Sequence, residues 1–332
     1  MLTDQLQRPF RDLRISVTDR CNFRCRYCMP RERFGEDFGF LPRSEVLSFE
    51  ELTRVAAQCV ALGVHKVRIT GGEPLLRAEL PRLIQMLRQL GDLDLALTTN
   101  GVLLPKHAAD LKAAGLDRVT VSLDALDPIT FQAMCDANYT PNDVLAGIKA
   151  AEKAGFGSIK INTVVKRGVN DQEILPIAQR FKGTGHVVRF IEYMDVGTTN
   201  GWRLDEVVTQ AEILEKLRTT GTLTEIRPAT DGVAQRFSYG DGTGEVGVIA
   251  SVSQPFCGQC SRGRLSAEGK FYTCLFATSG LDLKSWLRSG KTDAELRALI
   301  EETWLRRGDR YSEIRASHTG PRRRIEMSYI GG

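Results

Sequence analysis

Six of the eight cysteines in this chain fall into two groups whose spacing suits metal chemistry. The first group is Cys21, Cys25 and Cys28, in the run CNFRCRYC that follows the strand-like stretch 13–17. Cysteine thiolates are the usual protein ligands of iron–sulfur clusters. Three thiolates can hold a [4Fe-4S] cubane but leave one iron without a protein ligand. We therefore expect a cluster whose open iron binds a small molecule and passes it an electron.

Zinc is the main alternative occupant of this first cysteine group. Structural zinc sites take four ligands, commonly as two CxxC-like pairs. Here three cysteines stand in an uneven CxxxCxxC spacing with no nearby histidine, and Tyr27 beside the last cysteine adds to the iron–sulfur interpretation. A disulfide is disfavoured because the chain is long and its first residues, MLTDQ, lack a charged-then-apolar secretory signal.

The second cysteine group lies far along the chain and encloses two arginines. Cys257 and Cys260 precede Arg262 and Arg264, and Cys274 completes the group. Three cysteines again predict a cluster with an open iron, and the arginines predict a phosphate-bearing or otherwise anionic ligand beside it. The two remaining cysteines stand alone on helix-like stretches, and we expect them to be small buried side chains: Cys59 and Cys135.

Strands and helices must position these groups, and they alternate roughly every 30 residues over the first two-thirds of the chain. Such alternation predicts parallel βα units. Six units are too few for a closed eight-fold barrel, so we expect an α/β fold, a partial (βα)6 TIM-like barrel over residues 1–222. Short strands and glycines then predict a C-terminal layer over 223–332 that caps the sheet and carries the second cluster. The expected strands are 13–17, 66–70, 93–99, 118–123, 158–166 and 187–194.

Polar residues gather where the predicted strands end, which is where this architecture places an active site. The paired glycines Gly71 and Gly72 follow the second strand and would let the backbone approach a ligand closely, although a tight turn explains them as well. A set of cations on the strands could converge on a polyanion, while each one alone is better explained as a surface or rim charge. These cations are Arg14, Arg68, Lys160 and Arg189.

The bulk composition argues against several classes of protein. With 332 residues and 42% hydrophobic content, the chain can bury a sizeable core, and it has no apolar run of membrane length. A net charge of +4 lacks the basic excess of a nucleic-acid binder. We expect a cytoplasmic protein that binds neither membrane nor nucleic acid.

Taken together, CxxxCxYC and Gly-Gly-Glu-Pro at the next strand end resemble the radical S-adenosylmethionine (SAM) superfamily. The second cysteine group with its RxR, and the terminal Gly-Gly, are similar to the GTP 3′,8-cyclase family. The resemblance implies a lyase that converts GTP to (8S)-3′,8-cyclo-7,8-dihydroguanosine 5′-triphosphate, the first step of molybdenum cofactor biosynthesis. It implies two [4Fe-4S] clusters and SAM as cofactors. A 5′-deoxyadenosyl radical would remove the 3′ hydrogen of the ribose, and C3′ would then bond to C8.

The resemblance also implies roles for individual residues. The residues implied to contact SAM are Tyr27, Gly72, Ser122 and Met194. Those implied to contact GTP are Arg14, Arg68, Thr99, Lys160, Arg262, Gly263 and Arg264. Further substrate support is implied for Arg189 and for the tail glycines Gly331 and Gly332, for which a frayed terminus is the plain alternative. The implied partners are a flavodoxin-type electron donor, cyclic pyranopterin monophosphate synthase as the next enzyme, and a second copy of the chain.

Two other functions stay open at this point. A radical SAM peptide-modifying enzyme also carries an auxiliary cluster, but such enzymes usually have more C-terminal cysteines and lack the arginine pair. A non-catalytic zinc module that binds nucleic acid would be colourless, whereas two cubanes would give a brown protein with about eight irons.

Overall fold

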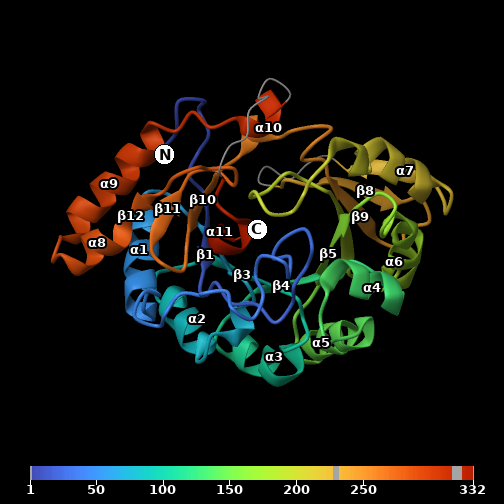
Figure 1. Cartoon of the computed structure of the whole chain (residues 1–332), viewed down its shortest axis with the longest axis horizontal. Helices are drawn as coiled ribbons and strands as arrows, with labels where there is room; N and C mark the ends of the chain where they lie inside the picture. The colour runs from blue at the N-terminus through green and yellow to red at the C-terminus, as the bar shows by residue number, and fades with distance from the viewer. Residues whose placement is uncertain (1, 227–231, 316–323, 332) are drawn as a thin grey trace.

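The computed structural model describes residues 2–226, 232–315 and 324–331. Its strands form one curved twelve-stranded sheet with helices around the outer face (Figure 1). The eight central strands all run parallel. In sheet order they are β10 (Arg262–Leu265), β1 (Asp12–Ser16), β2 (Lys66–Thr70), β3 (Asp94–Thr99), β4 (Arg118–Ser122), β5 (Lys160–Val165), β6 (Val187–Glu192) and β9 (Glu245–Ile249).

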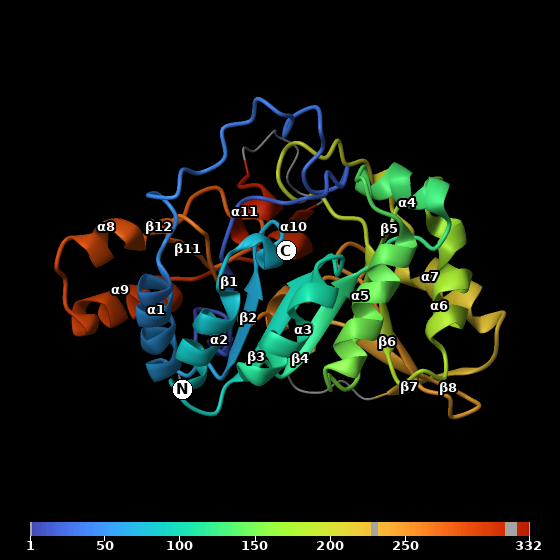
Figure 2. The same ribbon diagram turned by 90° about the horizontal axis from the view of Figure 1, so that it is seen from below.

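The connections between the parallel strands are mostly helices, which line the outside of the curve (Figure 2). Helix α1 shows why they start where they do: the Ser48 hydroxyl accepts from Glu51 N, and the Glu51 carboxylate accepts from Ser48 N. These helices are α1 (Phe49–Ala61), α2 (Leu80–Arg88), α3 (Leu104–Ala113), α4 (Pro128–Cys135), α5 (Pro141–Lys153), α6 (Ile174–Phe181) and α7 (Gln210–Arg218). Short 3-10 turns are η1 (Pro74–Leu76), η2 (Asp171–Glu173), η3 (Leu204–Glu206) and η4 (Cys257–Gln259).

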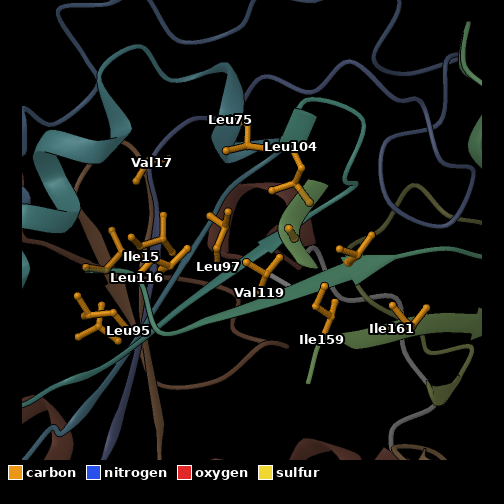
Figure 3. Close-up of a cluster of buried hydrophobic side chains, with 14 of the residues drawn as sticks. Ile15, Val17, Leu75, Leu95, Leu97, Leu104, Leu116, Val119, Ile159 and Ile161 are labelled. Atoms are coloured by element: carbon orange, nitrogen blue, oxygen red, sulfur yellow. The ribbon is translucent and has the colours of Figure 1, made fainter. Parts of the chain in front are cut away.

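The two faces of the sheet differ in chemistry because successive side chains on a strand point to opposite faces. The outer face is apolar and packs against the helices in the core (Figure 3), with Ile15, Leu97 and Ile161 fully buried. The alternate positions Arg14 and Lys160 point to the inner face. Barrel interiors are usually filled with branched apolar side chains, so a cationic interior indicates a binding site.

The C-terminal residues lengthen the sheet at both edges, whereas we expected them to cap it. Strand β9 pairs with β6 and strand β10 pairs with β1, both in parallel. The edges are completed by antiparallel strands: β11 (Lys270–Tyr272) and β12 (Leu281–Asp282) beyond β10, and β8 (Gln235–Tyr239) and β7 (Leu223–Ile226) beyond β9. Within the described ranges no pairing joins β12 to β7, so the barrel is open.

The last helices pack against α1 on one side of the molecule and then return the chain to β1, near the centre of the curved sheet. Helix α9 (Asp293–Leu305) packs against α1, and α8 (Leu283–Arg288) packs against α9. After α10 (Tyr311–Ile314), helix α11 (Met327–Ile330) contacts β1 and places the C-terminus near the centre of the curve (Figure 1). None of the helices in the described ranges is long and apolar enough to span a membrane.

Candidate active site

A cavity with about 200 Å³ of free space lies inside the curved sheet. Its wall joins two parts of the molecule that are distant in sequence, because β10 lies beside β1. The predicted site residues that line it are Arg14, Arg68, Lys160, Arg189, Met194, Cys257, Cys260, Arg262, Arg264 and Cys274. The sheet therefore brings the predicted cations and the second cysteine group together.

The cations in this wall outnumber its acidic side chains, which are Asp12 and Asp309. Burial, followed by repulsion from Arg189 and other cations, lowers the pKa of Lys160 to about 7. Burial also lowers the pKa of Arg189 to about 9, and burial with Arg264 and Arg262 lowers the pKa of Arg14 well below its usual range. An anion bound among these groups would relieve both the repulsion and the desolvation.

Several buried polar atoms in the same wall have no hydrogen-bond partner among the described residues. They include Nε of Arg14, Arg68 and Arg189, and Oδ1 of Asn162. A buried donor without an acceptor costs free energy, and guanidinium donors match phosphate oxygens. The wall thus fits a ligand that carries phosphate acceptors together with a hydroxyl or amino donor.

The C-terminal tail enters this site. The Arg264 guanidinium donates to the carbonyl oxygens of Ile330, at 3.2 Å, and Gly331. Gly331 has a φ of 68°, and a Cβ there would overlap the Thr70 side chain. Only glycine fits such a place, since it combines a left-handed backbone with no space for a side chain. Gly332 lies outside the described residues.

In the second cysteine group, the Cys260 sulfur is surrounded by cations. It accepts from Nη2 of Arg262 and Nη2 of Arg307, each at 3.1 Å. Burial would raise the pKa of Cys260, but the two guanidinium groups outweigh it and bring that pKa to about 6. This sulfur is therefore a thiolate at neutral pH, the form that binds iron.

In the first cysteine group, hydrogen bonds shape a tight loop directly after β1. Both Cys28 N and Met29 N donate to the Cys25 carbonyl oxygen, at 2.9 and 2.8 Å. Burial, helped by the neighbouring cysteines, raises the pKa of Cys21 and Cys28, so these sulfurs need a bound cation to become thiolates. Among the described residues no three Cys, His, Asp or Glu side chains converge on a single ion.

The glycine pair after β2 packs directly against the first cysteine loop. A Cβ on Gly71 would lie 2.5 Å from the Thr18 carbonyl oxygen, and one on Gly72 would overlap the Arg20 carbonyl. Gly72 N donates to Thr18 O at 2.9 Å, and Glu73 N donates to Arg20 O at 2.8 Å. The pair is therefore required for backbone approach, and it holds the loop that presents the cysteines.

Comparisons with known proteins agree with this geometry. A radical SAM superfamily model matches residues 15–181, and a Molybdenum Cofactor Synthesis C model matches residues 186–313. A GTP 3′,8-cyclase from Acidothermus cellulolyticus is 53% identical over 359 residues, covering 100% of this chain and 99% of the relative. This chain belongs to the GTP 3′,8-cyclase family.

Other cyclase-family relatives are similar along their whole length. Those from Xanthomonas campestris and Staphylococcus saprophyticus are 51% and 50% identical, each over 100% of this chain and over 97% and 99% of the relative. Membership confirms the predicted family, the radical SAM enzyme class and the cofactors, namely SAM and iron–sulfur clusters. It does not support the peptide-modifying or zinc-module alternatives.

Solved structures confirm the fold. SuiB from Streptococcus suis has a TM-score of 0.62 at 15% identity, covering 93% of this chain and 68% of SuiB. SuiB bound to S-adenosylmethionine has a TM-score of 0.61, covering 97% of this chain and 76% of that one, also at 15% identity. At such low identity the likeness concerns the radical SAM fold alone.

Some residues implied by the cyclase-family resemblance lie outside the cavity wall. The Thr99 hydroxyl points to the other face of β3 and donates to Glu73 at 2.8 Å, while Thr98 lines the cavity. A Cβ on Gly263 would lie 2.7 Å from the Phe10 ring, so this position serves core packing. Strand alternation explains both cases, since neighbouring residues face opposite sides.

Of the four residues expected to contact SAM, Met194 lines this cavity, whereas Tyr27, Gly72 and Ser122 do not. Ser122 ends β4. The Tyr27 hydroxyl donates to the Asp124 carboxylate at 2.9 Å, and Val164 N donates to the same carboxylate at 2.9 Å. Burial raises the pKa of Asp124 to about 6. Tyr27 therefore ties the first cysteine loop to the ends of β4 and β5.

Sequence reasoning missed a buried ionic group behind the second cysteine group. Arg307 is 3% exposed, and Arg8 and Asp4 are 1% and 3% exposed. Arg8 and Arg307 both line the cavity. Neither stands in a recognisable motif, so only the long-range fold could have indicated them.

Proposed function

We propose that this chain is a GTP 3′,8-cyclase that holds SAM and GTP between two clusters inside the curved sheet. The observation that carries this proposal is the cationic cavity, whose wall includes the second cysteine group and three buried guanidinium Nε atoms that have no acceptor in the described part of the chain. Family membership supplies the reaction, and the residue roles below are the finer part of the proposal.

The cysteine groups hold the two [4Fe-4S] clusters. Cys21, Cys25 and Cys28 bind the first, and the second is bound by Cys257, Cys260 and Cys274. When bound, the first cluster and SAM supply a 5′-deoxyadenosyl radical, which removes the 3′ hydrogen of GTP before C3′ bonds to C8. The residues that position SAM are Tyr27, Gly72, Ser122 and Met194.

The cations of the cavity bind and orient GTP. Arg14, Arg68 and Lys160 contact its triphosphate and ribose, with Arg189 as further support. Arg262 and Arg264 contact it from the C-terminal region. Hydrogen transfer needs close and aligned approach, and cations on several strands would fix the substrate at both ends. The remaining predicted contacts are Thr99, Gly263, Gly331 and Gly332, of which Gly263 can offer only its backbone.

The partners follow from the same assignment. A flavodoxin-type electron donor would supply the electron to the first cluster. We further propose residues 1–222 as the radical SAM part and 223–332 as the cluster- and substrate-binding extension. Hand-off to cyclic pyranopterin monophosphate synthase, a homodimer and a cytoplasmic location stay predictions from the sequence.

Anaerobic turnover tests the proposed function. Reconstituted, reduced protein is incubated with SAM and GTP, and the products are analysed by mass spectrometry. We expect 5′-deoxyadenosine and a cyclised guanosine triphosphate, and Cys25→Ala should abolish both products because the first cluster loses a ligand. Formation of 5′-deoxyadenosine without any cyclised nucleotide would contradict the proposal.

A further inference from the structure

Two buried arginines share one aspartate behind the second cysteine group. The Asp4 Oδ2 accepts from Arg8 Nε at 2.6 Å and from Arg307 Nη1 at 3.1 Å. The side chains of Arg8 and Arg307 are 1% exposed, and that of Asp4 is 0% exposed. Burying charged groups is costly unless they are paired. A second carboxylate, that of Asp309, lies 3.8 Å from Arg307 Nε but is 35% exposed, so a single buried carboxylate faces the two buried guanidinium groups. The Cys260 sulfur is a further electron-rich partner for Arg307.

Arg307 holds the backbone on both sides of the second cysteine group. Its Nη1 donates to the Cys260 carbonyl oxygen at 2.7 Å, and its Nε donates to the Thr273 carbonyl oxygen, directly before Cys274, at 3.0 Å. Its Nη2 donates to the Cys260 sulfur at 3.1 Å. One planar guanidinium thus fixes two segments of chain and contacts one sulfur.

Arg8 holds the backbone at Cys257, the first cysteine of that group. Its Nη1 donates to the carbonyl oxygens of Cys257 at 2.9 Å and Asp309 at 2.6 Å. Its Nη2 is buried without a hydrogen-bond partner among the described residues, and Arg8 lines the cavity. The sulfur atoms of a cluster would supply the missing acceptor.

We propose that Asp4, Arg8 and Arg307 are positioning residues for the second cluster, and that Arg307 also raises its reduction potential. This inference rests on the proposed function, because it needs a cluster at Cys257, Cys260 and Cys274. Hydrogen bonds to cluster sulfurs and nearby positive charge stabilise the reduced, more negative cluster. The Asp4 carboxylate orients both guanidinium groups toward the cysteine loops.

The shape of the guanidinium matters as well as its charge. Arg307 stacks over Trp304, with Cζ 4.5 Å from the ring centroid, so its plane is fixed. A lysine keeps the charge but offers one nitrogen. It cannot reach Asp4, the Cys260 sulfur and the Thr273 carbonyl from three directions.

The experiment compares Arg307→Met and Arg307→Lys with the wild type and with Arg306→Met. Arg306 is the matched control because its side chain is 77% exposed and pairs only with Glu302 among the described residues. Each reconstituted protein is assayed for iron and sulfide per chain, for the midpoint potential of the second cluster by EPR-monitored titration, and for the SAM-induced EPR change of the first cluster.

We expect Arg307→Met either to lose about half of the iron or to keep the second cluster at a more negative potential. Arg307→Lys should fall between Met and wild type, and it serves as the readout if the Met variant does not fold. In both variants the SAM-induced signal of the first cluster should be unchanged, as it should be in Arg306→Met.

Full iron content with an unchanged second-cluster potential in both Arg307 variants would overturn the inference. Equal loss of both clusters would also overturn it, because that would indicate a general folding defect. Wild-type protein separates this failure from failure of the proposed function. About eight irons in the wild type support two cubanes, whereas about four would contradict the function proposal itself.

Discussion

At the scale of single residues, Lys160 is the cation whose charge depends most on conditions near neutral pH. Burial and neighbouring cations lower its pKa to about 7, so it is roughly half protonated there in the free enzyme. A bound triphosphate would favour the charged form and raise this pKa. GTP binding should therefore take up a proton above about pH 7.

This predicts that GTP affinity falls as the pH rises above about 7, by at most about tenfold per pH unit. The affinity is measured by calorimetry on reconstituted protein over the range in which the fold is intact, with SAM affinity as the internal control. Lys160→Arg should flatten the profile, because guanidinium has a much higher intrinsic pKa. A wild-type profile as flat as that of the Arg variant would contradict the role of Lys160.

Residue types and strand alternation predicted that Arg14 and Lys160 lie on the inner face, where both line the cavity. The cluster-binding roles of the cysteines stay predictions. Strand alternation also explains why Thr99, a predicted GTP contact, is not in the cavity wall. Thr98 lines the cavity and Thr99 does not. Arg307 could not be recognised as part of the site because its partners, Asp4 and the Cys260 loop, are remote in sequence.

At the scale of elements, Glu73 joins the turn after β2 to the end of β3. Its carboxylate accepts from Leu75 N at 3.0 Å, Thr99 Oγ1 at 2.8 Å and Asn100 N at 2.8 Å. Burial raises its pKa to about 7. The carboxylate thereby fixes the glycine pair that supports the first cysteine loop.

Glu73→Gln should destabilise the fold by about 1–3 kcal/mol, because the amide NH2 would face a backbone N–H and leave a buried donor unpaired. Urea unfolding of the apo-protein measures this at pH values of about 5 and 8, because the raised pKa of Glu73 means that the wild type itself loses stability as this carboxyl ionises between them. Glu79→Gln is the control, since Glu79 is exposed in the next turn. Equal stability of the two variants would show that Glu73 does not join these elements.

Most helices and strands were predictable because each carries its own signals, such as the Ser48–Glu51 capping box and the apolar alternation of β5. The places of β9 and β10 were not, because short strands next to glycine turns do not reveal their partners. Pairing Asp12 with Arg262 joins segments from opposite ends of the chain. The sequence indicated the second cluster. It did not indicate that β10 pairs with β1 and completes the cavity wall.

At the scale of the whole molecule, one continuous sheet brings the second cysteine group, a cationic wall and the C-terminal tail around one cavity, while the first cysteine group lies in the loop after β1 and not in the cavity wall. The tail contacts Arg264 through the Gly331 carbonyl oxygen. Residues from both ends of the chain therefore surround the cavity. This arrangement predicts that a radical formed at the first cluster acts on a nucleotide held against the second.

The most direct test of that arrangement is turnover with GTP deuterated at C3′, followed by mass spectrometry of the 5′-deoxyadenosine. GTP deuterated at another ribose carbon serves as the control. We predict that deuterium moves from C3′ to 5′-deoxyadenosine and that the control gives unlabelled product. Unlabelled 5′-deoxyadenosine from the C3′ substrate, or label from the control, would contradict the account.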